Sequence, residues 1–138
     1  MRIVLDTNVL VSALLNPFGS PGRILDLILG GAIRILYDDR ILAEYRDVLL
    51  RPRFGFEKQY VQRLMEYLIF TGEGVSAAIL KVDAVDMDDV MFAEVAISGA
   101  ADALVTGNPN HFTFLEHPPV LSPAAFIQMW AKKNGERD

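Results

Sequence analysis

The sequence predicts an α/β fold: a three-layer sandwich with a mainly parallel central sheet of about five strands flanked by helices. Two observations lead to this prediction. Short apolar runs alternate along the chain with stretches that have helical hydrophobic spacing. Strands that alternate with helices are typical of a parallel sheet covered on both faces. In addition, 51% of the 138 residues are hydrophobic, which is enough to bury a full core.

The predicted strands are apolar runs bounded by glycine, proline or acidic residues. They fall at Ile3–Leu5, Ala32–Tyr37, Ala78–Val82, Ala103–Thr106 and Val120–Leu121. The predicted helices occupy Val9–Leu15, Arg23–Leu29, Ile41–Leu50, Glu57–Phe70, Val90–Ser98 and Pro123–Lys133. Serine followed by proline is a typical helix start and occurs at Ser20 and Ser122, whereas the glycine pair at 30–31 is a typical helix end.

The chain shows no internal repeat, low-complexity segment or linker, so we expect one domain over residues 1–138 with a frayed tail at 134–138. No apolar run approaches the roughly 18 to 20 residues that span a bilayer. Asp6 interrupts the first apolar run too early for a signal sequence. The absence of cysteine excludes disulfides, thiolate metal sites and cysteine nucleophiles. These features favour a cytoplasmic protein without a membrane partner.

The formal net charge of −5 argues against a general polyanion binder. The charge is unevenly distributed, however, because residues 40–63 contain six basic side chains against three acidic ones. Such a basic flank beside an acidic pocket could bind nucleic acid, with Arg40, Arg46, Arg51 and Arg53 as the candidate substrate-binding residues. The solvated faces of two helices would explain the same charges.

Asp6, Thr7 and Asn8 directly follow the first predicted strand. Ligands bind at the carboxyl ends of parallel strands in an open α/β sheet, so Asp6 lies where chemistry is expected. All three are also good N-cap residues, and one of them could simply start the next helix.

Two further carboxylates are candidates for the same place. Glu44 lies at the edge of the apolar stripe of its helix, where it can face a cleft. Asp89 shares a helix face with Phe92 and Ala93, and a carboxylate on that inward face needs a partner or a metal ion. Capping is the alternative for this acidic stretch, and it suits Asp86 or Asp88 better than all three acids together.

Thr106 and Asn108 end another predicted strand and should reach the same edge of the sheet, although a turn would use the same residues. Asp102 precedes that strand and is interpreted as structural. Three carboxylates and an amide oxygen would form a hard oxygen site suited to Mg²⁺ or Mn²⁺. The two histidines, His111 and His117, are not at metal-ligand spacing, and the sequence contains neither a Walker-type phosphate loop nor a nucleophile elbow.

The order of these motifs resembles the PIN domain family over essentially the entire chain. The matching segments are Asp6-Thr7-Asn8, Glu44, Asp86 through Phe92, and Ala101 through Asn108. The closing segment, with His111-Phe112, the stretch from Pro119 to Pro123, and Phe126, is similar to the branch of toxins from toxin and antitoxin pairs.

The resemblance implies a metal-dependent ribonuclease with Asp6, Glu44 and Asp89 as catalytic metal ligands and Asn108 at the fourth position. Many PIN domains have aspartate there, so a second metal ion should bind more weakly to this chain. The resemblance also implies an RNA substrate, a homodimer and a small antitoxin that inserts into the active-site groove. Thr7, Asn8 and Thr106 would support the site.

The residues fit this chemistry without the family name, because metal ions activate water and neutralise the phosphate that carboxylates would repel. Our hypothesis is therefore a Mg²⁺- or Mn²⁺-dependent endoribonuclease acting on single-stranded RNA. One alternative is a PIN fold that has weak or no activity and serves as a binding partner. A phospho-receiver domain is another, although Leu121-Ser122-Pro123 lacks the lysine expected after the last strand. A haloacid-dehalogenase-like phosphatase would need an aspartate where Asn8 stands.

Overall fold

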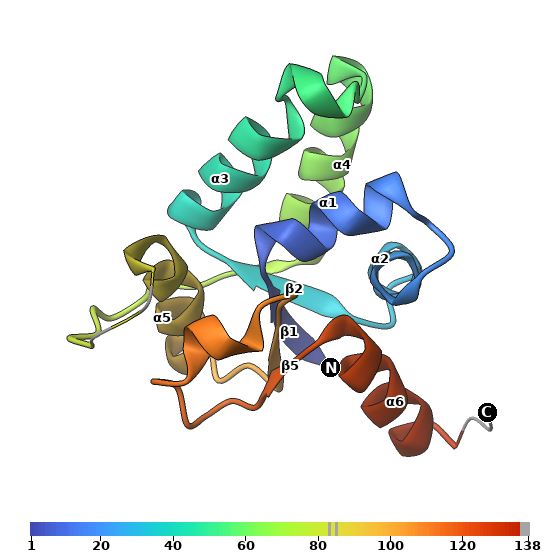
Figure 1. Cartoon of the computed structure of the whole chain (residues 1–138). Coiled ribbons are helices and arrows are strands. Elements are labelled where there is room, and N and C mark those ends of the chain that lie inside the picture. Colours follow the sequence, from blue (N-terminus) through green and yellow to red (C-terminus); the bar gives the residue numbers. More distant parts are fainter. Residues whose placement is uncertain (83, 85, 136–138) are drawn as a thin grey trace.

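The computed structural model describes residues 1–82, 84 and 86–135 and contains a five-stranded, fully parallel sheet (Figure 1). Its order is β3-β2-β1-β4-β5. Ile3 of β1 pairs with Ile35 of β2 on one side and with Ala103 of β4 on the other. The strands are β1 (Arg2–Leu5), β2 (Arg34–Tyr37), β3 (Glu73–Gly74), β4 (Ala103–Val105) and β5 (Val120–Leu121).

All six predicted helices are present in the described part of the chain, with boundaries that differ by at most a few residues. They are α1 (Thr7–Leu15), α2 (Ser20–Leu29), α3 (Asp39–Leu49), α4 (Lys58–Thr71), α5 (Val90–Ser98) and α6 (Pro123–Lys133). The connections of the described chain also contain short 3₁₀ turns: η1 (Pro52–Phe54) between α3 and α4, η2 (Met87–Asp89) directly before α5, and η3 (Pro109–Phe112) between β4 and β5. The predicted three-layer α/β class is therefore confirmed.

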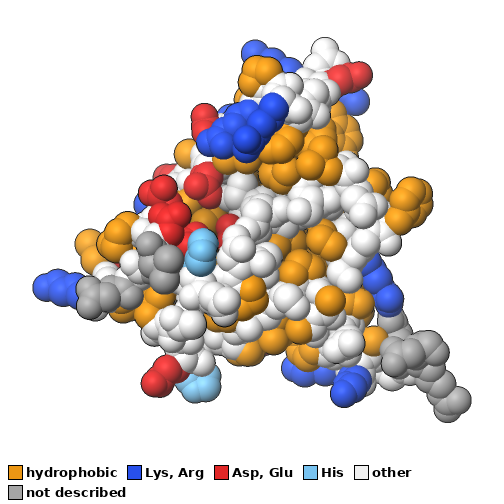
Figure 2. Space-filling model, in the orientation of Figure 1, with side chains coloured by type: hydrophobic (Ala, Val, Ile, Leu, Met, Phe, Trp, Pro, Cys, Tyr) orange, Lys and Arg blue, Asp and Glu red, His pale blue; other side chains and the backbone are white. Residues whose placement is uncertain are grey.

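The chain adds strands on one side of β1 as far as β3 and then continues with β4 on the other side of β1. A binding site is expected at this reversal of the strand order. Right-handed crossovers put the helices of the β1–β2 and β2–β3 connections on one face of the sheet and α5 on the other. In Figure 1, α5 lies on the side of the sheet away from α1 and α2. The connections diverge at the carboxyl ends of β1 and β4, which opens the crevice where α/β folds bind ligands. Figure 2 shows acidic side chains gathered on this part of the surface.

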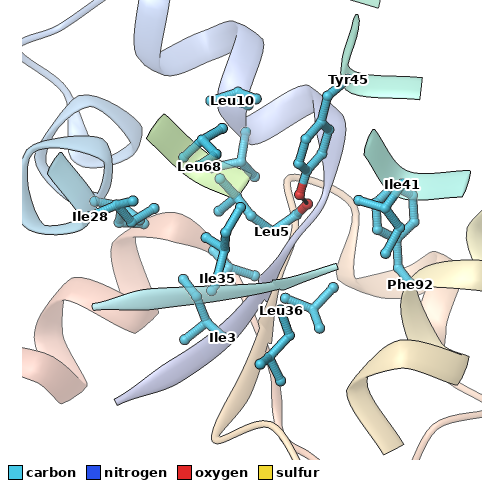
Figure 3. Close-up of a cluster of buried hydrophobic side chains, with 14 of the residues drawn as sticks. Ile3, Leu5, Leu10, Ile28, Ile35, Leu36, Ile41, Tyr45, Leu68 and Phe92 are labelled. Atoms are coloured by element: carbon cyan, nitrogen blue, oxygen red, sulfur yellow. Dashed lines mark hydrogen bonds between the residues drawn. The ribbon is translucent and has the colours of Figure 1, made fainter. Parts of the chain in front are cut away.

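The core lies on both faces of the sheet, because consecutive residues of β1 are buried. Ile3, Val4 and Leu5 are each at most 2% exposed, although successive strand residues point to opposite faces. Figure 3 shows Ile3 and Leu5 among side chains from the neighbouring strand β2 and from α1, α4 and α5. This double covering makes the end of β1 a rigid base for the residue that follows it.

The predicted strand at Ala78–Val82 is wrong, because the third strand is the two-residue β3, which pairs with Leu36 and Tyr37. The 78–82 segment packs against α5 instead. The backbone N–H of Ala78 donates to Ser98 Oγ at 2.9 Å, and that of Leu80 donates to Glu94 Oε2 at 2.7 Å. Side chains of α5 therefore satisfy donors that a sheet ladder would otherwise satisfy.

Tyr45 joins α3 to the end of β1. Its ring is fully buried, and its hydroxyl donates to the carbonyl oxygen of Leu5, the residue before Asp6 (Figure 3). Burial raises the pKa of Tyr45, with further contributions from the charges of Asp6 and Glu44, so the phenol stays protonated and remains a donor. This contact holds the helix that carries Glu44 against the strand that carries Asp6.

The last helix, α6, ends at Lys133, directly before the tail at 134–138 that the sequence predicts to be frayed. Residues 136–138 of this tail lie outside the described residues. Within the described residues, none of the helices is long and apolar enough to cross a membrane.

Replacing Tyr45 with phenylalanine should destabilise the protein by about 1–2 kcal/mol, because the buried hydrogen bond to Leu5 is lost while the ring is kept. Urea unfolding followed by circular dichroism measures this change. The matched control is Tyr60→Phe on α4, where the side chain is 49% exposed and the effect should be near zero. Equal unfolding midpoints for the two variants would contradict the role given to Tyr45.

Candidate active site

A cavity of about 380 Å³ opens at the carboxyl end of β1, and five acidic side chains line it. They come from three distant parts of the chain: Asp6 after β1, Glu44 on α3, and Asp86, Asp88 and Asp89 at the start of α5. Figure 2 shows a group of acidic side chains on this part of the surface, beside a histidine and near basic side chains. The predicted acids Asp6, Glu44 and Asp89 thus border one cavity.

Asp6 is anchored across the strand reversal. Its backbone N–H donates to the carbonyl of Val105 at 2.9 Å, and its Oδ2 accepts from Thr106 Oγ1 at 2.7 Å. The residue occupies the N-cap position of α1, and its side chain makes no hydrogen bond of capping geometry, although the backbone N–H groups of Thr7 and Asn8 act to lower its pKa. Because burial still raises the pKa of Asp6 overall, capping is not enough to explain this buried carboxylate.

Glu44 reaches the cavity from the middle of α3 and is half-buried. Its Oε2 accepts a hydrogen bond from the hydroxyl of Thr7, the first residue of α1. The sequence places Glu44 at the edge of the apolar stripe of its helix. In the structure, this edge borders the cavity.

Asp89 enters the site between η2 and α5, with its side chain only 13% exposed. Its Oδ2 lies 3.1 Å from Nδ1 of His111, and it makes no capping hydrogen bond. The capping alternative holds instead for Asp86, which accepts from the backbone N–H of Asp88 at 2.9 Å. In this acidic stretch, Asp86 therefore caps a helix, whereas Asp89 lies in the cavity as a candidate functional residue.

The surroundings of Asp6 and Asp89 disfavour the ionised form of both carboxylates. Burial raises the pKa of Asp6, and the charge of Asp89 raises it further, although the hydrogen bond from Thr106 lowers it. Burial also raises the pKa of Asp89, and so do the charges of Asp86 and Glu44. The ionised site therefore carries negative charge that the protein does not fully neutralise.

The supporting residues organise the backbone around Asp6. Thr106 is fully buried, and besides donating to Asp6 it accepts from the backbone N–H of Asn108 at 3.0 Å. Asn8 accepts from the N–H of Gly107 at 3.3 Å. The Asn108 side chain is exposed and does not line the cavity, so its role as fourth ligand stays a prediction.

The four candidate arginines lie in three places. Arg51 and Arg53 line the cavity. Arg46 lines a separate hollow beside residues of α4. Arg40 pairs at 2.7 Å with both Asp38 and Glu94.

The buried Glu94 was not predicted from the sequence. It lies in the interior of α5, is only 4% exposed, and accepts from Arg40 and from the backbone of Leu80. His111 was also missed as a site residue, although η3 returns it to the site only three residues after Asn108. An acid on a buried helix face is the signal that could have identified Glu94.

The donor set fits a divalent cation in its chemistry. Carboxylate oxygens are the ligands that Mg²⁺ and Mn²⁺ prefer, and a cation would relieve the repulsion that raises the pKa of Asp6 and Asp89. Among the described residues, however, no three His, Asp or Glu side chains are close enough together to form a ready-made metal site. Mg²⁺ usually keeps several of its waters and is held by one or two carboxylates, so it does not need a ready-made cluster of three.

Asp6→Asn should stabilise the protein at neutral pH, because it removes a buried charge that is repelled by its neighbours. The native pKa is raised, so the wild type loses stability as the pH rises through that value. The gain should vanish below about pH 4, where the carboxyl is protonated in both states. Each 1 kcal/mol would appear as a rise of roughly 4 °C in Tm by calorimetry. The exposed Asp26→Asn is the control, and a lower Tm for Asp6→Asn at neutral pH would refute the prediction.

Comparison with known proteins identifies the family. The sequence model of the PIN domain matches residues 2–110. An uncharacterized protein of Methanocaldococcus jannaschii, MJ1680, is 30% identical over 96% of this chain and 93% of its own length. The crystal structure of VapBC2 from Rickettsia felis, bound to a DNA fragment from their promoter, is similar in fold, with a TM-score of 0.59 and 19% identity over 88% of this chain and 98% of that one. The chain therefore belongs to the PIN domain family, whose members are generally nucleases.

Proposed function

We propose that this protein is an endoribonuclease that depends on Mg²⁺ or Mn²⁺ and hydrolyses phosphodiester bonds of single-stranded RNA. The observation that carries this proposal is the convergence of Asp6, Glu44 and Asp89, from three distant segments, on one cavity at the strand reversal of a PIN fold. The family match gives no support to the phospho-receiver alternative.

In this proposal Asp6, Glu44 and Asp89 hold the cation, and Asn108 contributes an amide oxygen. A bound divalent cation supplies an activated water near neutral pH and neutralises charge on the phosphate. Thr106 and Thr7 orient the carboxylates of Asp6 and Glu44 through their hydroxyl groups. Such outer partners keep ligand oxygens pointed at the ion.

The arginines next to the acids account for substrate attraction by an acidic chain. Arg51 and Arg53 line the same cavity as the carboxylates, so their positive charges can attract a polyanionic strand to the site. Arg46 and Arg40 would assist only at longer range, because Arg46 faces another hollow and Arg40 is paired with Glu94.

We further propose that the protein is the toxin of a pair, acts in the cytoplasm, forms a homodimer and is inhibited by a small antitoxin. The fold similarity to VapBC2 supports this proposal. Asn108 supports the second candidate function, an inactive PIN domain that serves as a binding partner. Its side chain is uncharged and lies outside the cavity lining, where the resemblance would favour a metal-binding aspartate.

Purified protein should cleave single-stranded RNA with Mn²⁺ or Mg²⁺ and should lose this activity in EDTA. Asp6→Asn should reduce the cleavage rate by more than the roughly 10–100-fold lost when an outer partner of a metal ligand is removed. Asp26→Asn on α2 should cleave at the wild-type rate, because it is exposed and distant from the site. Cleavage that persists in EDTA and in Asp6→Asn would indicate a contaminant. No cleavage with any metal would favour the inactive binding partner.

Thr106→Val should weaken metal binding by roughly 10–100-fold, because Asp6 loses the hydroxyl that orients it, whereas Thr106→Ser should retain most of the affinity. The measurement is the Mn²⁺ concentration needed to raise Tm, since an ion that binds only the folded state stabilises it. Identical Mn²⁺ dependence in wild type and Thr106→Val would show that this hydroxyl does not support the site.

A further inference from the structure

The cavity has a second kind of wall beside its acids. Three residues from the turn η1 and the position just before it line the cavity together, and we call them the arginine–phenylalanine wall: Arg51, Arg53 and Phe54. The guanidinium carbon of Arg53 lies 4.7 Å from the centroid of the Phe54 ring. That ring is nearly parallel to the ring of Phe56, with 5.8 Å between centroids and 15° between planes. The wall therefore presents flat, partly exposed groups beside the carboxylates.

No acidic side chain of the described residues pairs with the guanidinium of Arg53. Among the residues that the structure describes, Arg53 has no ion pair, although five acids line the same cavity. Within the described part of the chain, Arg51 pairs with Asp47 at 3.3 Å, and that contact is solvent-exposed. Exposed pairs of this kind contribute little to stability and exchange readily for another anion. The wall thus offers one free guanidinium and one weakly held guanidinium.

We propose that Arg53 and Phe54 form a stacking platform for one unpaired base of a single-stranded nucleic acid, and that Arg51 binds an adjacent phosphate. This inference rests on the proposed nuclease function and specifies the form of its substrate. Aromatic rings and guanidinium planes stack on any base, because every base has a flat π face. The platform therefore selects strandedness rather than sequence.

The position of the wall determines which nucleotide it contacts. Glu44 and the end of α3 at Leu49 are separated by roughly 8 Å along the helix axis, and the wall begins beyond that end. Successive nucleotides of a stacked strand are separated by about 3.4 Å. The platform therefore holds a flanking nucleotide rather than the one next to the carboxylates. In a duplex this base would stay stacked and paired, so duplexes should bind poorly.

Packing alone explains only part of the wall. Phe54 and Phe56 pack against the hydrophobic core, and this accounts for their apolar character. It does not account for an arginine over the Phe54 ring that lines the cavity and has no ion pair among the described residues. Variants that preserve the apolar volume or the charge, but remove the flat surface, separate these two explanations.

The test measures binding without cleavage, in the Asp6→Asn background. Fluorescence anisotropy would follow a short labelled oligoadenylate, its deoxy counterpart and a duplex, each with and without Mg²⁺. Added Phe54→Leu and Arg53→Lys should each weaken single-strand binding about tenfold, the scale of one lost base stack. Lysine keeps the charge of Arg53 but lacks its plane. Arg51→Gln should lower the salt dependence of binding by about one contact.

Matched controls lie outside the cavity. Phe18→Leu in the α1–α2 connection, where the ring is 98% exposed, and Arg63→Lys on α4 should leave affinity unchanged. Circular dichroism of each variant checks its folding. An abasic nucleotide at one position of the strand should weaken binding to the Asp6→Asn parent, but not further weaken binding to Asp6→Asn with Phe54→Leu.

The platform is refuted if Phe54→Leu and Arg53→Lys bind like the parent, if abasic losses are equal in both backgrounds, or if duplex and single strand bind equally. Cleavage by the wild type in Mn²⁺ together with any of these results would leave the nuclease function standing. Absence of cleavage by the wild type would instead refute the nuclease function, even if the strand stacks as proposed.

Discussion

Carboxylates that repel one another line one cavity, and the structure around the site depends on holding these partly buried charges close together. Each of the three central acids has a different hydrogen-bonding partner: Thr106 for Asp6, Thr7 for Glu44 and His111 for Asp89. These contacts offset part of the desolvation cost but leave the pKa of Asp6 and Asp89 raised. Stability has been given up at the place where charge is concentrated, as functional sites commonly require.

Two contacts, one buried and one half-exposed, join the elements that carry the acids. The hydroxyl of Tyr45 joins α3 to the end of β1, and the pair of Arg40 with Glu94 joins the first turn of α3 to α5. The tight core beneath the sheet makes this arrangement stiff, because close-packed interiors do not deform gradually.

Much of the fold could be predicted from the sequence, because capping residues and hydrophobic periodicity indicate where most helices and strands lie. Serine at position 122 starts α6 as predicted, with its Oγ accepting from Ala125, and α5 spans the residues that its periodicity indicates. The strand predicted at Ala78–Val82 failed for the opposite reason. An apolar run of that length is compatible with a strand or with a segment packed on a helix, and only the partner decides between them. That partner is α5, through Glu94 and Ser98.

By itself, the sequence determined the parallel α/β class and the placing of Asp6, Glu44 and Asp89 where they could meet, because strand ends and inward helix faces follow from periodicity. Only the tertiary structure decided which partners those acids have, that Arg40 pairs with Glu94 whereas Arg53 has no ion pair among the described residues, and that Asn108 lies outside the cavity lining. The physical reason is the separation along the chain between the residues that interact. Periodicity reflects neighbours within a few residues, whereas these contacts join side chains that the crossing of helices and strands brings together from 22 to 100 residues apart.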